Sequence, residues 1–463
     1  MNEKLKKVVK KASERGSAHI IKDIISSARA ADQTAIEANV SRAVIMALQG
    51  KEDLSDVPYG EPYWYGTAPG GGGSSSPYYT ARHEAFRAKV RAFVDNELLP
   101  YVHEWDEKGA FPDELHRKAY AAGIYGAAWP AEHGGTPPPG GFDAFHDLIL
   151  VDELARCGCG GVLWSCFQSF GISLPPVLAA GRPELIQKVA RPVITGEAVM
   201  SLAVSEPYAG SDVANLRTTA VLQGDHFVVN GEKKWITGGC KADFFTVAVR
   251  TGGPGFNGVS LLLIESNRKG VSTRRMKTQG WWSSTTAYIT FDEVRVPVGN
   301  LIGEQNKGFK YIMQNLNHER FVLGAQANRF ARVCLEEAIM WARQRKTFNK
   351  YHIEHQVIRH KIAEMARRIE STHAWIEQLA YQYQTGSSDS KSLGSAIALM
   401  KVHATKNFEF CAREASQILG GSSYVREGKG QMIERLYREV RVSAIGGGSE
   451  EVLIDMAVRQ AKL

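Results

Sequence analysis

The sequence predicts an α+β protein in which a helical domain is followed by a compact β domain and then by a second set of long helices. Apolar residues recur at helical spacing from Tyr78 to about Glu197, and again from Gly308 onward. Between these stretches the pattern changes to short β-rich runs, punctuated by the turn-forming dipeptides Asn230-Gly231 and Gly252-Gly253. Helices, then strands, then helices indicate separate packed layers around more than one core.

We therefore expect four parts: an N-terminal extension and linker (1–77), an N-terminal α-helical domain (78–197), a middle β domain (198–300) and a C-terminal helical bundle (301–463). The first 50 residues have a basic helical pattern, and their acids Glu3, Glu14 and Asp23 argue against a transit peptide. Residues 51–77 are rich in Gly, Pro, Ser and Tyr, which is typical of a flexible linker.

Composition restricts the class of protein. The chain has 463 residues, of which 44% are hydrophobic and 23% are charged, enough for cores in two or three domains. Its net charge of +7 is spread out apart from a cluster between Lys4 and Arg15, so a nucleic-acid partner is not expected. The six cysteines lack CxxC spacing, so we expect neither a metal site nor a disulfide framework. No apolar run approaches the length of a membrane span, which needs about 20 residues.

Individual elements follow from the same patterns. In the helical domain, breaks are expected at residue 123 and at 130–141 and 158–161. In the β domain, strands are expected at 201–204, 226–230, 244–249, 258–265 and 287–291. In the bundle, helices are expected to break near 349, 385–392, 420–430 and 446–448.

The stretch 301–350 is predicted to form one long helix. Its apolar residues form a stripe along one face: Phe309, Ile312, Met313, Leu316, Leu323 and Ala327. Glu319 lies inside this stripe, where lost hydration would raise the pKa of its carboxyl toward the range of a general base. The alternative is an exposed glutamate paired with Arg320 or Arg329.

Five further stretches carry polar groups that suit a ligand. AVSEPYAGSDVANL (203–216) follows a strand and offers the hydroxyls of Ser205 and Ser211. NGEKKWITGG (230–239) places Trp235 beside Ile236 and Thr237, although a tryptophan in a β domain is usually part of the core.

The other three stretches lie in the bundle. Arg345-Lys346-Thr347 with His355-Gln356 could hold a diphosphate, or the cations could simply stabilise a helix C-terminus. QILGG (417–421) and IGGGSEE (445–451) complete the set, and the GxG of the last follows a helix, so it is no dinucleotide fingerprint.

Taken together, the order and spacing of these stretches from Tyr78 to Leu463 resemble the acyl-CoA dehydrogenase family. SEPYAGSD resembles the family's TEPGAGSD, NGEKKWITGG its NGxKxWITN, RKTFNKYHIEHQ its RKTFGKxxxEHQ, and YREVRVSAIGGGSEEV its RDAKIYQIYEGTSQI. The resemblance implies the family fold: an N-terminal helical domain, a middle β-barrel or sandwich, and a C-terminal four-helix bundle. Residues 1–77 have no counterpart in it.

The resemblance also implies FAD, bound between the β domain and the bundle and touched by a neighbouring subunit of a homo-oligomer, either a tetramer or a dimer. The positions that match flavin contacts are Ser205, Trp235, Ile236 and Thr237, while Ser211 matches a serine that contacts cofactor and thioester ligand. Diphosphate and adenosine contacts match Arg345, Thr347 and Gln356, with Gln417 and Gly421 from a second subunit. Ser449 and Glu451 match contacts that follow the catalytic loop.

The implied reaction is dehydrogenation of an acyl-CoA thioester, in which a carboxylate removes the α-proton and the β-hydride passes to flavin N5. Most members carry the base in YEGT, where this chain has Gly447. A minority, including isovaleryl and long-chain types, carry it on the helix before RKT, at the position of Glu319. The N–H of Gly447 would then polarise the thioester carbonyl. Asn317 and Arg320 would face the ligand or serve a structural role.

Several alternatives remain open at this point. Ala461-Lys462-Leu463 resembles the C-terminal peroxisomal address, so a peroxisomal matrix location stands beside a cytoplasmic one for a soluble protein. In peroxisomes the electron acceptor would be O2 rather than an electron-transfer flavoprotein, and the enzyme an oxidase. The same fold hosts flavin monooxygenases and DNA-associated flavoproteins without clear turnover.

Overall fold

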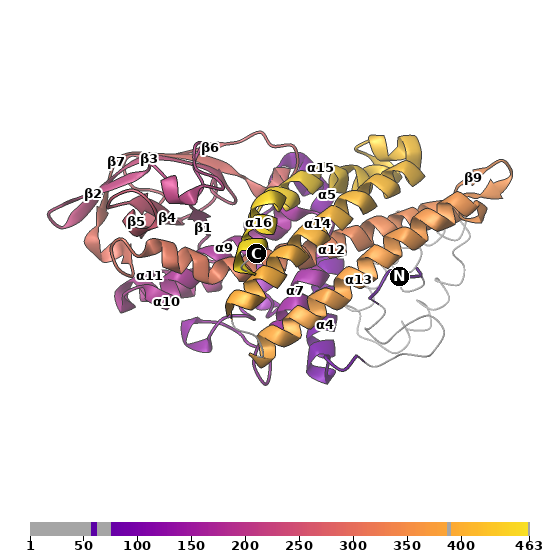
Figure 1. Ribbon diagram of the computed structural model, residues 1–463, viewed down its shortest axis with the longest axis horizontal. Helices are drawn as coiled ribbons and strands as arrows, with labels where there is room; N and C mark the ends of the chain where they lie inside the picture. Colours follow the sequence, from indigo (N-terminus) through magenta and orange to yellow (C-terminus); the bar gives the residue numbers. More distant parts are fainter. Residues whose placement is uncertain (1–56, 63–75, 387–389, 462–463) are drawn as a thin grey trace, which may run out of the picture.

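A computed structural model describes residues 57–62, 76–386 and 390–461 of the chain. The β domain lies at one end of the elongated molecule and the long helices extend away from it (Figure 1). Most of the N-terminal extension, the predicted linker and the last two residues of the C-terminal tripeptide fall outside the described residues.

The N-terminal helical domain is built from short helices. They are α4 (Ala81–Phe93), α5 (Val102–Lys108), α6 (Glu114–Ala121), α7 (Ala144–Ala155), α8 (Gly160–Val162), α9 (Ser169–Ser173), α10 (Pro175–Ala180) and α11 (Pro183–Ile194), with π-helical turns at Val94–Leu98 and Leu163–Gln168. Helix α7 begins where the Asp143 carboxylate accepts hydrogen bonds from the N–H groups of Phe145 and His146. The breaks expected at 130–141 and 158–161 separate helices as predicted.

The expectation that no apolar run reaches the length of a membrane span is wrong. Residues Gly160–Ala180 form a helical stretch of 21 residues that is long and apolar enough. Within that stretch, 72% of the apolar window is buried inside the protein, as in the core helix of a soluble protein. The stretch is also divided among α8, a π-helical turn, α9 and α10.

The middle domain is one eight-stranded sheet in the order β6-β7-β3-β2-β4-β5-β8, with β1 paired in parallel to β4. Its strands are β1 (Met200–Ala203), β2 (Thr219–Gln223), β3 (His226–Ile236), β4 (Phe244–Arg250), β5 (Val259–Glu265), β6 (Val271–Arg275), β7 (Ala287–Pro297) and β8 (Leu301–Ile302). All five expected strands are present. Strands β2 and β6 were missed because most of their residues are exposed and give no apolar alternation.

The turn predicted at Asn230-Gly231 is also wrong, because both residues lie inside β3. The register between β3 and β7 shifts between Val229 and Gly231, which marks a β-bulge. Gly231 has φ +147°, and a Cβ there would lie 2.6 Å from the Thr218 Cα. Close approach of another backbone therefore explains this glycine.

The C-terminal bundle is dominated by α12 (Gly308–Gln344), α13 (Gln356–Thr385), α14 (Ser390–Leu419), α15 (Gln431–Ile445) and α16 (Glu450–Gln460). The helix predicted over 301–350 is shorter than expected at both ends. Leu301–Ile302 pairs with β5 as β8, and β9 (Lys346–Thr347) and β10 (Lys350–Tyr351) form a small hairpin. This hairpin lies at the end of the molecule opposite the β domain (Figure 1).

Helix α12 passes between the other helices and joins the two helical domains. Its His318 pairs with Asp147 of α7, at 2.8 Å between Nε2 and Oδ2. About three turns further along, the buried Arg329 donates from Nε to Asp152 Oδ1, also of α7, at 2.9 Å. The N-terminal domain and the bundle thus share one hydrophobic core with α12 inside it.

Candidate active site

Glu319 is buried on α12, with 9% of the residue exposed. Burial raises the pKa of its carboxyl to about 7, against the smaller lowering effects of His318, a hydrogen bond from Asn315, and Arg320. No ion pair joins Glu319 to Arg320 or Arg329 within the described residues, because Arg329 binds Asp152. The alternative of an exposed, paired glutamate is therefore wrong.

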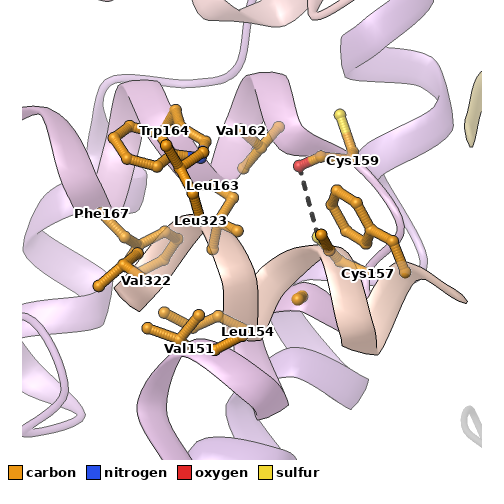
Figure 2. Close-up of a cluster of buried hydrophobic side chains, with 14 of the residues drawn as sticks. Val151, Leu154, Cys157, Cys159, Val162, Leu163, Trp164, Phe167, Val322 and Leu323 are labelled. Atoms are coloured by element: carbon orange, nitrogen blue, oxygen red, sulfur yellow. Dashed lines mark hydrogen bonds between the residues drawn. The ribbon is translucent and has the colours of Figure 1, made fainter. Parts of the chain in front are cut away.

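The apolar stripe that contains Glu319 is only partly buried. Ile312, Leu323 and Ala327 are buried, whereas Met313 is 38% exposed. Figure 2 shows how Val322 and Leu323 pack against Val151 and Leu154 of α7 and against the segment that contains Trp164. Apolar side chains therefore surround the helix one turn beyond Glu319, which explains the loss of hydration at the carboxyl.

Gly447 lies in the Gly446–Gly448 turn that joins α15 to α16, and this turn packs directly on α12. Its φ is +67°, and a Cβ at this position would lie 2.7 Å from Leu323 Cδ1 and 3.7 Å from Arg320 Cγ. Since Leu323 is one helical turn after Glu319, the structure brings Gly447 and Glu319 into one region. The close approach and the left-handed backbone both favour glycine.

Two buried cations hold the carbonyl groups of this turn. Arg320 Nε donates to the Gly447 oxygen at 3.0 Å. Lys401 of α14, fully buried, donates from Nζ to the oxygens of Ala444 at 2.7 Å and Gly448 at 3.0 Å. Burial lowers the pKa of Lys401 to about 8. Because a peptide plane contains one residue's C=O and the next residue's N–H, these bonds fix the directions of the N–H groups of residues 445, 448 and 449, on either side of Gly447.

Asn317 lies next to this group, because its Oδ1 accepts a hydrogen bond from Arg320 Nη1 at 3.3 Å. Ser449 and Glu451 follow the turn at the start of α16, half-buried and exposed respectively. Sequence reasoning missed Lys401. Its only signal is a lysine within the apolar run of α14, and such a pattern more often marks a side chain whose charged end reaches solvent.

A second buried lysine shapes the loop that carries Ser205 and Ser211. Lys233 of β3 donates to the Val204 oxygen at 3.0 Å and to Glu206 Oε1 at 2.7 Å, so it holds the residues on either side of Ser205. The Ser205 oxygen accepts from the Lys234 N–H at 2.9 Å. Ser205 is half-buried and Ser211 is exposed at the surface of the loop.

Trp235 stands at the end of β3 with φ +63° and is 49% exposed, so it is not a core residue as a tryptophan in a sheet usually is. Ile236 beside it is buried, and Thr237 is half-buried with its carbonyl accepting from Ser169 Oγ of α9 at 3.4 Å. A strained residue that holds a large aromatic plane at the surface suits a flat ligand ring.

The remaining predicted cofactor residues lie far from Glu319. Arg345 follows the last residue of α12, which at 1.5 Å per residue places it about 39 Å along the helix from Glu319. Lys429 donates to Gln344 at 2.9 Å, so the region after α14 reaches the same end of the bundle. That end carries Arg345, Thr347, Gln356, Gln417 and Gly421. One chain therefore does not bring these five residues and the residues around Glu319 to the same ligand.

Two groups of potential metal ligands occur outside this region: His83 with Asp143 and His146, and Asp106 with Cys159 and Glu439. In the first group, the Asp143 carboxylate already forms hydrogen bonds with both imidazoles, with Arg82 and with two backbone N–H groups. In the second, Asp106 accepts from Ser283 and Glu439 accepts from the Gly160 N–H. Hydrogen bonding within the protein accounts for most of these atoms.

Comparison with known proteins identifies the family. Models of acyl-CoA dehydrogenases match the chain as an N-terminal domain at 80–197, a middle domain at 201–294 and a C-terminal domain at 306–462. The acyl-CoA dehydrogenase AFT10-1 of Alternaria alternata is 41% identical over 420 residues, covering 88% of this chain and 96% of the relative. The mitochondrial long-chain specific acyl-CoA dehydrogenase of Rattus norvegicus is 31% identical over 386 residues, covering 82% and 87%. A crystal structure of a probable acyl-CoA dehydrogenase from Mycobacterium abscessus gives a TM-score of 0.78 at 39% identity, covering 83% of this chain and all of that one.

The chain belongs to the acyl-CoA dehydrogenase family. It is thus an oxidoreductase of this class, with FAD as its cofactor. The predicted family and fold are confirmed, including the helical, sheet and helical domains in that order. The match to AFT10-1 covers 88% of the present chain, which is a larger share than residues 78–463 make up. The match therefore extends into the N-terminal extension. The extension therefore does have a partial counterpart.

Lys401 provides a test of the turn geometry. Lys401→Met keeps an unbranched side chain but leaves the Ala444 and Gly448 carbonyls without their donor. We expect flavin content to be retained and the red shift of a bound 3-aryl-acryloyl-CoA, which reports polarisation of its carbonyl, to be reduced. The control is Lys406→Met, an exposed position on the same helix. An unchanged red shift in Lys401→Met would show that the lysine does not set the turn.

Proposed function

We propose that this acyl-CoA dehydrogenase uses Glu319 to remove the α-proton of an acyl-CoA thioester and produces a trans-2-enoyl-CoA. The observation that carries the proposal is a buried carboxyl, with its pKa raised to about 7, beside the turn that contains Gly447. A base with a pKa near the working pH is both partly ionised and strong enough to accept a proton. Burial alone supplies this tuning, because no ion pair holds the carboxyl in its charged form.

The residues present fit FAD. Bound FAD supplies the acceptor for the β-hydride at its N5. Trp235 offers an exposed aromatic plane, with Thr237 beside it and Ser205 held in place by Lys233 and Lys234. We assign these residues and Ile236 to the flavin ring, and Ser211 to cofactor and thioester contacts.

Polarisation of the thioester carbonyl is the second requirement, because an α-proton is otherwise too weakly acidic for a carboxylate. We assign this role to the Gly447 N–H. Arg320 and Lys401 bind the carbonyls of Gly447 and Gly448, which supports a turn whose backbone is held in place before a ligand arrives. Asn317 and Arg320 then lie at the substrate side of the turn, with Ser449 and Glu451 following it.

The separation of about 39 Å between Glu319 and Arg345 supports a homo-oligomer. We propose that Arg345, Thr347, Gln356, Gln417 and Gly421 contact the diphosphate and adenosine of FAD bound mainly by a second copy of the chain. Phe348, at the tip of the hairpin, is 92% exposed and Val357 is 60% exposed. Exposed apolar residues at this end suit an interface between subunits, in a tetramer or a dimer.

For the acceptor we favour an electron-transfer flavoprotein over O2. A flavin monooxygenase has no use for the buried base, and a DNA-associated role is not supported by the mixed charges of the bundle. The C-terminal Ala461-Lys462-Leu463 supports a peroxisomal matrix location as the alternative to a cytoplasmic one.

The central prediction concerns Glu319→Gln, which removes the base while keeping shape and hydrogen-bonding groups. Folding and FAD content should be retained, and anaerobic flavin bleaching by the acyl-CoA that reduces the wild type should slow by about 10²- to 10⁴-fold. A panel of thioesters of varied length and branching would identify that substrate first, and admission of air afterwards would separate oxidase from dehydrogenase. Glu304→Gln, at an exposed position before α12, is the control. Normal bleaching in Glu319→Gln would disprove the assignment.

The pKa of Glu319 gives a separate prediction. Only the carboxylate accepts a proton, so the bleaching rate should rise tenfold per pH unit below about 7 and level off above it. Asn315 lowers this pKa through its hydrogen bond, so Asn315→Ala should move the inflection to higher pH. Stopped-flow absorbance across this range measures both curves. A rate that does not change with pH through 7 would exclude Glu319 as the titrating base.

A further inference from the structure

The segment Val57–Pro62 lies well before the first family domain, which begins at residue 80, yet it is packed into the protein. Val57 is 4% exposed and belongs to the main hydrophobic core, and the Gly60 N–H closes a turn onto the Val57 oxygen at 3.0 Å. In Figure 1 it appears as a short indigo segment beside the long helices. A surface linker would not be expected to bury an apolar side chain in this way.

Two arginines of α12 bind the backbone of this segment. Arg332 Nη1 donates to the Tyr59 oxygen at 2.8 Å, and Arg329 Nη1 approaches the Gly60 oxygen at 3.4 Å. Both arginines have no exposed surface. Their guanidinium groups therefore depend on protein acceptors, and the segment supplies two of them.

The Glu61 carboxylate meets arginines from two helices. It pairs with Arg87 and with Arg91 of α4, the latter at 2.6 Å between Nη2 and Oε1, and lies 3.7 Å from Arg329 Nη2. Burial would raise the pKa of Glu61, but Arg329, Arg91 and Arg87 outweigh it and lower the pKa to about 2. Glu61 is thus fully charged at neutral pH.

Charge balance shows why this carboxylate matters. Arg87 and Arg91 also bind Glu153 of α7, and Arg329 binds Asp152 of α7. Three guanidinium groups therefore share the carboxylates of Glu61, Glu153 and Asp152, and without Glu61 both Arg87 and Arg91 would lose one of their anionic partners. A buried charge that loses its partner is strongly destabilising, far more than the loss of a surface ion pair.

We propose that residues 57–62 are a strap that docks into an arginine-lined seam between α4, α7 and α12, where Glu61 supplies one of the carboxylates that balance the buried arginines. The strap fixes α12, the helix of Glu319, against the N-terminal domain. The match of AFT10-1 into the extension agrees with a strap that is part of the fold. The proposal does not rest on the role of Glu319.

The test uses the full chain and the variant Glu61→Gln, with Glu84→Gln, an exposed glutamate on α4, as the matched control. Thermal unfolding and hydrogen exchange are measured on both. We expect Glu61→Gln to lower the unfolding midpoint by roughly 3 °C or more and to lose exchange protection at the Gly60 N–H, which bonds to the Val57 oxygen, and near Arg329. The control should behave as wild type in both measurements.

A second variant separates charge balance from a simple loss of contacts. Glu61→Gln combined with Arg91→Gln removes one anion and one cation, so it should recover part of the midpoint lost in Glu61→Gln. If Glu61→Gln fails to fold, Glu61→Asp keeps the charge and should fold with reduced protection of the strap. Wild-type stability and protection in Glu61→Gln, a midpoint loss with the strap still protected, or no recovery in the double variant would each overturn the proposal.

Discussion

The packing of α12 through the centre of the helical domains is the constraint on which the rest of the structure depends. A helix in this position carries ionisable side chains into regions that exclude water, where each needs a partner. Arg329 takes Asp152 of α7, Arg332 takes Glu370 of α13, and Arg320 takes the Gly447 carbonyl. Neighbouring elements are thereby held to α12 by charged hydrogen bonds as well as by apolar contacts. Within the described residues Glu319 forms no ion pair, and burial raises the pKa of its carboxyl to about 7.

Buried lysines solve a related problem in the loops. Lys401 fixes the turn that contains Gly447, and Lys233 fixes the residues on either side of Ser205. In both cases an ammonium group with several donors binds backbone carbonyls that an irregular loop would otherwise leave unsatisfied. The burial that makes these bonds strong also lowers the pKa of each lysine to about 8. The loops to which we assign ligand contacts are thus positioned from the core.

The sequence was sufficient for what periodicity and motif order can encode: the order of the domains, the breaks between the long helices, and Glu319 on an apolar face. Exposed strands such as Thr219–Gln223 gave no signal, and the bulge at Gly231 has the same dipeptide as a turn. Long-range contacts could not be predicted either. No local sequence pattern predicts that Lys401 binds α15 or that Glu61 binds α4, because these partners depend on how the elements pack.

Glycine at position 447 has a steric reason. A Cβ at residue 447 would lie 2.7 Å from Leu323, so the side chain that a base at 447 would need points into space that α12 fills. Leu323 in turn packs next to Val322 against α7, and moving it would open a gap in the core (Figure 2). A side chain at 447 would therefore require Leu323 to shift from its present position. The base that we propose at Glu319 lies on the same helix one turn before Leu323, and glycine at 447 is consistent with that proposal.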